Sequence, residues 1–150
     1  WYRRKIKPPL KGDVESLGFY ADGGSEERFL GDFHGYPVEA SILKPDTFFK
    51  AFTFRVRLSF VPDQGLQHFI DHKNGYQRQL FRENGSTYRI NLVANALVMD
   101  FRFYHRIPLN GVKKALDVQT LWLENHGFNS CSHIEAERFA SSFEIEMYTP

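Results

Sequence analysis

The sequence has few of the features that mark secreted or membrane-spanning proteins. Its 150 residues include one cysteine, Cys131, which excludes an internal disulfide and is compatible with a reducing compartment. It has no uninterrupted apolar run of about eighteen residues, the length that predicts a membrane-spanning helix. A hydrophobic signal-peptide core is missing too, so we expect any membrane segment to lie before Trp1.

The motifs of common enzyme classes are also missing. The glycines at Gly31 and Gly35 do not have the Gly-x-Gly-x-x-Gly spacing of a dinucleotide site, and a predicted strand follows them instead of a helix. Neither Gly-Lys-Ser/Thr nor Gly-x-Ser-x-Gly occurs. The sequence therefore favours a protein that is not an enzyme, and we expect no cofactor.

Aromatic residues, in contrast, are abundant: the chain has 15 Phe, 7 Tyr and 2 Trp. Such side chains favour the half-buried surface of a β-sheet. The chain is long enough to bury the core of one domain, and 42% of its residues are hydrophobic. We assign residues 1–12 to a basic leader and residues 13–150 to a single domain.

Alternating apolar and polar residues predict most of the strands. The clearest alternation spans residues 52–60, where Arg55 and Arg57 fall on polar positions between buried ones. Weaker patterns predict further strands at residues 17–20, 28–33, 38–43, 87–93, 97–107 and 143–147. Short turns such as Asn84-Gly85 between these segments are typical of an antiparallel meander.

Two helices are expected besides the strands. Residues 111–126 carry an apolar stripe, with Asn110 as N-cap and Gly127 directly after the helix. A shorter helix, at about residues 64–73, is expected to end at Asn74-Gly75. The predicted fold is therefore α+β: a largely antiparallel meander sheet packed against one long helix (about 111–126) and one short helix (about 64–73).

The leader concentrates the positive charge of the chain. Five of its twelve residues are basic and none is acidic, which leaves fourteen basic and eighteen acidic residues, a net charge of −4, in residues 13–150. Two aromatic residues precede the basic ones, and Pro8 and Pro9 follow most of them. This order is expected just inside a membrane-spanning helix, although an ordinary basic tail is the alternative. The residues expected to contact a membrane surface or a membrane-protein partner are Trp1, Tyr2, Arg3, Arg4, Lys5 and Lys7.

The location expected from the leader is the cytoplasmic side of a membrane, or otherwise the cytoplasm. The acidic body of the protein argues against nucleic acid as a partner, because nucleic-acid binding needs a basic face.

Arginines occupy polar positions of several predicted strands and could form one cationic stripe, suited to an anionic lipid headgroup, a phosphate or an acidic protein partner. The residues are Arg55, Arg57, Arg89, Arg102 and Arg106. Cross-strand ion pairs would instead neutralise the stripe, and the sequence favours that alternative. The acidic residues available for such pairs are Glu39, Asp100, Glu144 and Glu146.

Two further clusters invite a chemical interpretation. His68 and His72 are four residues apart and could chelate a metal on one helix face, but the sequence identifies no third ligand, and solvated histidines are the favoured interpretation. Cys131 and His133 could pair as nucleophile and base. Residues two apart in a loop seldom face each other, so an unreactive thiol is favoured.

Three functions are compatible with the sequence. The first is a non-catalytic interaction or scaffold domain, the soluble part of a membrane-tethered protein or a subunit of a membrane-associated complex. The alternative is a small-ligand or lipid-binding domain, with a Phe-rich pocket lined by Phe54, Phe101 or Trp122. The third, for which the spacing of residues gives least support, is a metal-dependent enzyme.

Overall fold

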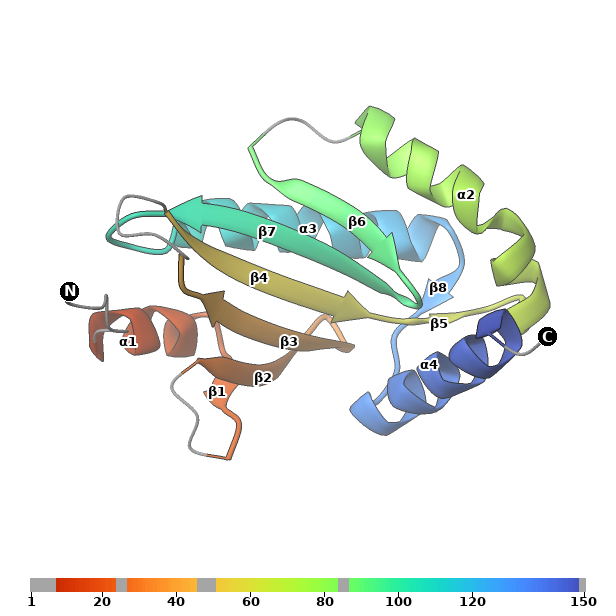
Figure 1. The fold of residues 1–150 in the computed structure, drawn as a ribbon, viewed down its shortest axis with the longest axis horizontal. Coiled ribbons are helices and arrows are strands. Elements are labelled where there is room, and N and C mark those ends of the chain that lie inside the picture. The colour runs from red at the N-terminus through yellow and green to blue at the C-terminus, as the bar shows by residue number, and fades with distance from the viewer. Residues whose placement is uncertain (1–7, 24–26, 46–50, 84–86, 149–150) are drawn as a thin grey trace.

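The computed structural model describes residues 8–23, 27–45, 51–83 and 87–148 (Figure 1). The helices are α1 (Pro8–Ser16), α2 (Gly65–Glu83), α3 (Leu109–Asn125) and α4 (His133–Tyr148). The strands are β1 (Tyr20–Ala21), β2 (Arg28–Phe33), β3 (Tyr36–Leu43), β4 (Phe52–Ser59), β5 (Val61–Pro62), β6 (Arg89–Val93), β7 (Ala96–Phe103) and β8 (Phe128–Asn129). The predicted α+β fold is confirmed.

The main sheet has six strands in the order β1-β2-β3-β4-β7-β6, and every neighbouring pair is antiparallel. Strands β1 to β4 follow one another as the predicted meander. After β4 the chain passes through α2, and the β6–β7 hairpin then returns so that β7, not β6, pairs with β4. Strands β5 and β8 form a separate two-stranded ribbon.

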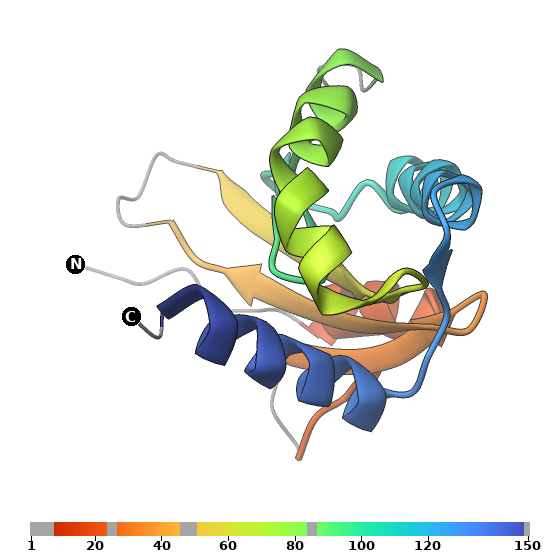
Figure 2. The ribbon, with the colours of Figure 1, turned by 90° about the vertical axis from the view of Figure 1, so that its right-hand side faces the viewer.

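The alternation in the strands gives the sheet one dry face and one polar face. On the dry face Ile42, Phe54 and Phe101 are direct cross-strand neighbours, and all three are buried. Helices α2 and α3 lie on this side of the sheet, and α4 lies on the other (Figure 2). At the edge of the dry face, the hydroxyl of the buried Tyr36 donates a hydrogen bond to the carbonyl oxygen of Phe128 (2.6 Å).

The predicted helices form, with different limits. Helix α3 begins at Leu109, so the expected cap Asn110 lies inside its first turn, and Gly127 follows it with φ +73° as predicted for a residue after a helix. The second helix runs to Glu83, ten residues beyond its predicted end. Gly75 is exposed on the helix surface, while Leu80 continues the buried stripe that begins at Phe69.

The prediction of a strand at residues 143–147 is wrong, because this segment belongs to α4. Its apolar residues do alternate, but the residues that pack inward, Ala136 and Phe143, are seven apart, which is two helical turns. A capping box starts the helix: the Glu135 amide donates to the Ser132 hydroxyl (3.1 Å), and the Ser132 amide donates to the Glu135 carboxylate (3.2 Å).

The first described helix includes residues that we assigned to the leader. Residues 8–12 form the first half of α1, and Leu10 is buried in the core. Proline is well tolerated in the first turn of a helix, since its missing N–H would have no intrahelical partner there. The strand predicted at residues 17–20 is reduced to β1, which starts at Tyr20.

Near both edges of the sheet, backbone groups of the strands form hydrogen bonds with side chains from the helices. On β6 the amide of Leu92 donates to the side-chain carbonyl of Gln77 in α2 (2.7 Å). On β2 the carbonyl oxygen of Gly31 lies 3.0 Å from Nε2 of His133 in α4. Helices on either side of the sheet thus occupy hydrogen-bonding positions near its two edges.

Candidate functional site

Four of the five predicted arginines lie together on the polar face of the sheet. Arg55 and Arg57 come from β4, Arg102 from β7 and Arg89 from β6, and strand alternation directs them to the same side. We call this group of four residues the arginine face. Arg55, Arg89 and Arg102 are exposed, and Arg57 is half-buried.

One arginine of this face is neutralised. Asp100 lies directly between Arg55 and Arg89 in the register of the three strands. The guanidinium of Arg55 binds both carboxylate oxygens of Asp100, at 2.8 Å and 3.0 Å. This hydrogen-bonded pair raises the pKa of Arg55 above its usual value. The predicted cross-strand neutralisation is therefore present at Arg55.

The remaining three arginines are not neutralised in this way. Arg57 faces Glu39 across β3 and β4, but Glu39 pairs with Arg28 on its other side (3.0 Å). Within the part of the chain that the structure describes, Arg57, Arg89 and Arg102 have no acidic side chain within ion-pair distance. The arginine face therefore carries a surplus of positive charge.

A solvent-open depression lies at one end of the arginine face. It has a volume of about 490 Å³. Its lining combines two arginines, two threonines, Tyr88 and the carboxylate already bonded to Arg55. The lining residues are Thr53, Thr87, Tyr88, Arg89, Asp100 and Arg102. Arginine and hydroxyl donors arranged in this way are suited to oxygen-rich anions.

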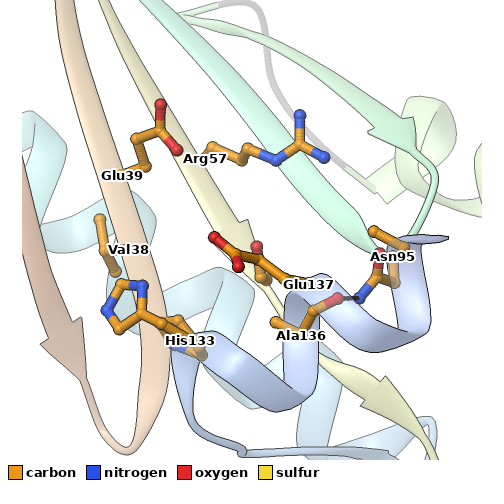
Figure 3. Close-up of a pocket in the computed structure, with 10 residues that line it drawn as sticks. Val38, Glu39, Arg57, Asn95, His133, Ala136 and Glu137 are labelled. Carbon is orange, nitrogen blue, oxygen red and sulfur yellow. Dashed lines mark hydrogen bonds between the residues drawn. The ribbon is translucent and has the colours of Figure 1, made fainter. Parts of the chain in front are cut away.

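A second, smaller hollow lies at the other end, where α4 crosses the polar face (Figure 3). Its volume is about 80 Å³, room for a few water molecules. Glu39, Arg57 and Glu137 line it, and Arg57 extends away from Glu39, toward β7 (Figure 3). The two carboxylates make this cleft unfavourable for an anion, so binding of anions is expected at the depression.

The same cleft is held together by a buried amide. Asn95, at the turn between β6 and β7, donates hydrogen bonds to the carbonyl oxygens of Phe60 (2.8 Å) and Ala136 (3.1 Å). These bonds attach α4 to the polar face of the sheet at the end of β4.

The fifth predicted arginine is elsewhere. Arg106 lies three residues past the end of β7, and its Nε donates to the carboxylate of the buried Asp13 in α1 (2.8 Å). Its inclusion in the stripe is therefore wrong, because the alternation of β7 does not continue to this residue. Glu144 and Glu146 also lie on α4 and not on a strand, so they are not cross-strand partners of the arginines.

The leader residues Trp1, Tyr2, Arg3, Arg4, Lys5 and Lys7 lie outside the described residues. Helix α1, which follows them directly, lies at the end of the sheet where β4 begins and β7 ends (Figure 1). The depression with Thr53 and Arg102 is at this same end. Across the described ranges, no helix has both the length and the apolar character needed to cross a bilayer.

The histidine pair does form on one face of a helix. His68 and His72 stack with ring centroids 4.1 Å apart, and Nδ1 of His72 lies 2.8 Å from the carbonyl oxygen of His68. In residues 8–23, 27–45, 51–83 and 87–148, no three His, Cys, Asp or Glu side chains gather as metal ligands. The metal interpretation thus gains no third ligand from the described structure.

Cys131 and His133 are directed apart. His133 reaches back to Gly31 and lies 3.8 Å from the carboxylate of Asp32. Burial, with the nearby carboxylate of Glu135, raises the pKa of the Cys131 thiol to about 11. A thiol with this pKa is almost entirely protonated at neutral pH and is a poor nucleophile.

The side chains expected to line an apolar pocket belong to the buried core. Phe54 is 0% exposed, Phe101 3% and Trp122 7%. Neither of the two hollows on the polar face includes them.

Sequence reasoning missed Thr53, Thr87 and Tyr88 as neighbours of the arginines. Thr53 sits on a polar position of the clearest predicted strand, so the signal was present in the alternation. Its position beside Arg102, however, depends on the register between β4 and β7, which the sequence alone does not determine.

Comparison with known proteins gives no family model, no curated relative and no solved structure that matches this chain. Its function has to be inferred from the site.

Proposed function

We propose that this chain is a non-catalytic interaction domain that meets an anionic membrane surface with its arginine face, assisted by the basic leader. The observation that carries the proposal is the group of Arg57, Arg89 and Arg102 on one sheet face, without an acidic partner among the described residues. Opposite charges paired across strands stabilise a sheet, so three arginines without such a pair leave a positive field that an anionic partner can meet.

The distribution of charge supports this orientation. Among the strand side chains, the four arginines have only Asp100 and Glu39 as acidic cross-strand neighbours, which leaves a surplus of two positive charges. The acidic helix α4 covers the other end of this side, beside Arg57, so the surplus is concentrated at the depression. Residues 13–150 as a whole carry a net charge of −4, so the rest of the surface is acidic. A domain with this polarity is attracted to an anionic surface in one orientation and repelled in the opposite one.

The basic leader supports the proposal through its charge. Arg3, Arg4, Lys5 and Lys7 stand close together in the sequence without an acidic residue among them. Each basic residue near an anionic leaflet contributes about 1 kcal/mol of attraction. The basic residues of the leader would therefore reinforce the attraction of the arginine face to an anionic surface.

The side chains considered for catalysis have other surroundings. The Cys131 thiol has a raised pKa, His133 bonds a backbone carbonyl, and His72 bonds the backbone of its own helix. None of them faces the depression.

The test is sedimentation with phosphatidylcholine vesicles that contain or lack phosphatidylserine, at low and physiological salt. The first variant carries Arg57→Gln, Arg89→Gln and Arg102→Gln. The matched control removes three exposed arginines from the helices α2 and α4, through Arg78→Gln, Arg82→Gln and Arg138→Gln. A third variant replaces Arg3, Arg4, Lys5 and Lys7 with Gln.

We expect the sheet variant and the leader variant to lose most of their binding to the anionic vesicles, and the helix control to keep it. Equal losses in the sheet variant and the helix control would mean that total charge alone decides binding, which contradicts the proposal. Binding of the wild-type chain to an acidic peptide but not to anionic vesicles would also overturn it, in favour of an acidic protein partner.

A further inference from the structure

The depression at the end of the arginine face has a more specific charge than the face as a whole. Arg55, Arg89 and Arg102 surround Asp100, which gives the site a net charge of +2. Both carboxylate oxygens of Asp100 are bonded to Arg55, so Asp100 is held away from the other two guanidinium groups. Arg89 and Arg102 are therefore the groups available to an incoming anion.

The strand register sets the spacing of these two arginines. Arg89 lies opposite Asp100, and Arg102 is two residues further along the same strand. Such diagonal neighbours on one face have Cα atoms about 7–8 Å apart. Two long side chains at this spacing can approach one tetrahedral anion from two directions, each with a pair of parallel N–H donors.

The remaining lining completes the donor set. The hydroxyls of Thr53 and Thr87 can donate to further oxygens. Tyr88, which also borders the depression, is fixed from the dry side of the sheet: its ring stacks on Phe101 with centroids 5.0 Å apart, and its hydroxyl accepts a hydrogen bond from Gln119 (2.9 Å). The volume of about 490 Å³ leaves room for the organic group that carries the anion.

We infer that this depression binds a phosphate monoester dianion, whose two charges match the local surplus and whose three terminal oxygens match the donors. The inference rests on the proposed function, because it names the anionic group that the same face recognises. A phosphate diester or a carboxylate carries one charge and offers two terminal oxygens, and therefore matches the site less well.

The first experiment titrates the chain with inorganic phosphate at constant ionic strength and follows backbone amide resonances by NMR. We expect the largest shifts at residues 87–89 and 100–103. Arg89→Gln and Arg102→Gln should each weaken phosphate binding by about tenfold, the loss of one charge-assisted hydrogen-bonding group. Arg138→Gln, an exposed arginine on α4, is the matched control and should bind as the wild type does.

Both substituted arginines are exposed and have no ion pair with a described residue, so the variants are expected to fold; the thermal midpoint of each checks this. Shifts spread evenly over all basic residues, or equal affinities for phosphate and acetate, would overturn the inference.

The second experiment asks whether the phosphate group belongs to a lipid or to a soluble molecule. It also gives different results for failure of this inference and for failure of the proposed function. It compares vesicles of phosphatidylcholine mixed with phosphatidic acid, a monoester, or with phosphatidylserine, a diester, at matched surface charge. Preference for phosphatidic acid that Arg102→Gln abolishes supports a monoester headgroup as the ligand. Equal binding to both vesicles overturns the inference and leaves the proposed function intact. Binding of inorganic phosphate but of neither vesicle type overturns the proposed function and supports a soluble phosphate monoester.

Discussion

The two faces of the sheet are built from the same strands and have opposite properties. On the dry face every side chain of β4 meets a buried neighbour, as Phe54 does between Ile42 and Phe101. One residue along the strand, Arg55 has a single ion pair and Arg57 has none among the described residues. The comparison shows that most of the buried core lies on one face, while three arginines of the other face have no ion-pair partner among the described residues.

The largest expected loss of stability comes from a substitution on the dry face. Phe54→Ala should lower the free energy of unfolding by about 3–5 kcal/mol, because it opens a cavity in a packed core. Urea denaturation measures the change. Arg102→Ala, on the other face, is the comparison and should leave the unfolding curve nearly unchanged. A small effect at Phe54 would mean that the two faces do not divide stability in this way.

The hydroxyl of Tyr36 is a buried polar group at the edge of the dry face. Burial, with the negative charges of Glu124 and of the Cys131 thiolate, raises the pKa of Tyr36 from 10.0 to about 12. The folded state therefore keeps a proton that the unfolded chain releases. Stability from this source is complete below pH 10 and is lost as the pH rises through 12, with a slope of at most about 1.4 kcal/mol per pH unit.

Tyr36→Phe should remove this slope from the unfolding free energy measured between pH 10 and 12. The background for both proteins is Cys131→Ser, since the thiol pKa of about 11 falls in the same range. Parallel alkaline unfolding curves for the two proteins would show that Tyr36 is not the group responsible.

Asn95 marks the place where the polar face is buried, beneath α4. Asn95→Ala should lower the free energy of unfolding by about 1–2 kcal/mol, because two carbonyl oxygens lose their donor in a buried position. Asn91→Ala, an exposed position on the same face of β6, is the control. If both substitutions cost the same, the amide of Asn95 does not hold α4 as described.

The smallest effect on stability is expected at Asp100. Asp100→Asn removes the ion pair with Arg55, which at a partly exposed site is worth less than about 1 kcal/mol. The same change adds one positive charge to the arginine face and should raise affinity for phosphatidylserine vesicles by about fivefold. Denaturation and vesicle sedimentation on one protein sample check both parts. Unchanged affinity would break the link between this face and anion binding.

The sequence predicts the two faces well, because alternation at residues 52–60 depends only on the two-residue period of a strand. It does not predict which strands are neighbours. Asp100 reaches Arg55 only because β7 pairs with β4, a contact between residues 45 positions apart in the chain. The depression depends on the same pairing, so its threonines could not be assigned to it from the sequence.

Helix α4 was missed for a different reason. Phe143, Ile145 and Met147 alternate as in a strand, while Ala136 and Phe143 repeat as in a helix. The same residues therefore fit both a strand period and a helix period. In the helix, the Phe143 ring packs against Phe69 of α2, with ring centroids 5.9 Å apart. Arg106 illustrates a similar limit, since its partner Asp13 is 93 residues away.

The side chains that bond the backbone near the edges of the sheet restrict how the domain can associate. The amide of Leu92 on β6 donates to the Gln77 side chain, and the carbonyl oxygen of Gly31 on β2 lies within hydrogen-bond distance of His133. Strand β1 has only two residues. These side-chain bonds occupy positions that a foreign strand would need in order to pair with the described edges. The fold therefore disfavours strand addition at Leu92 and Gly31.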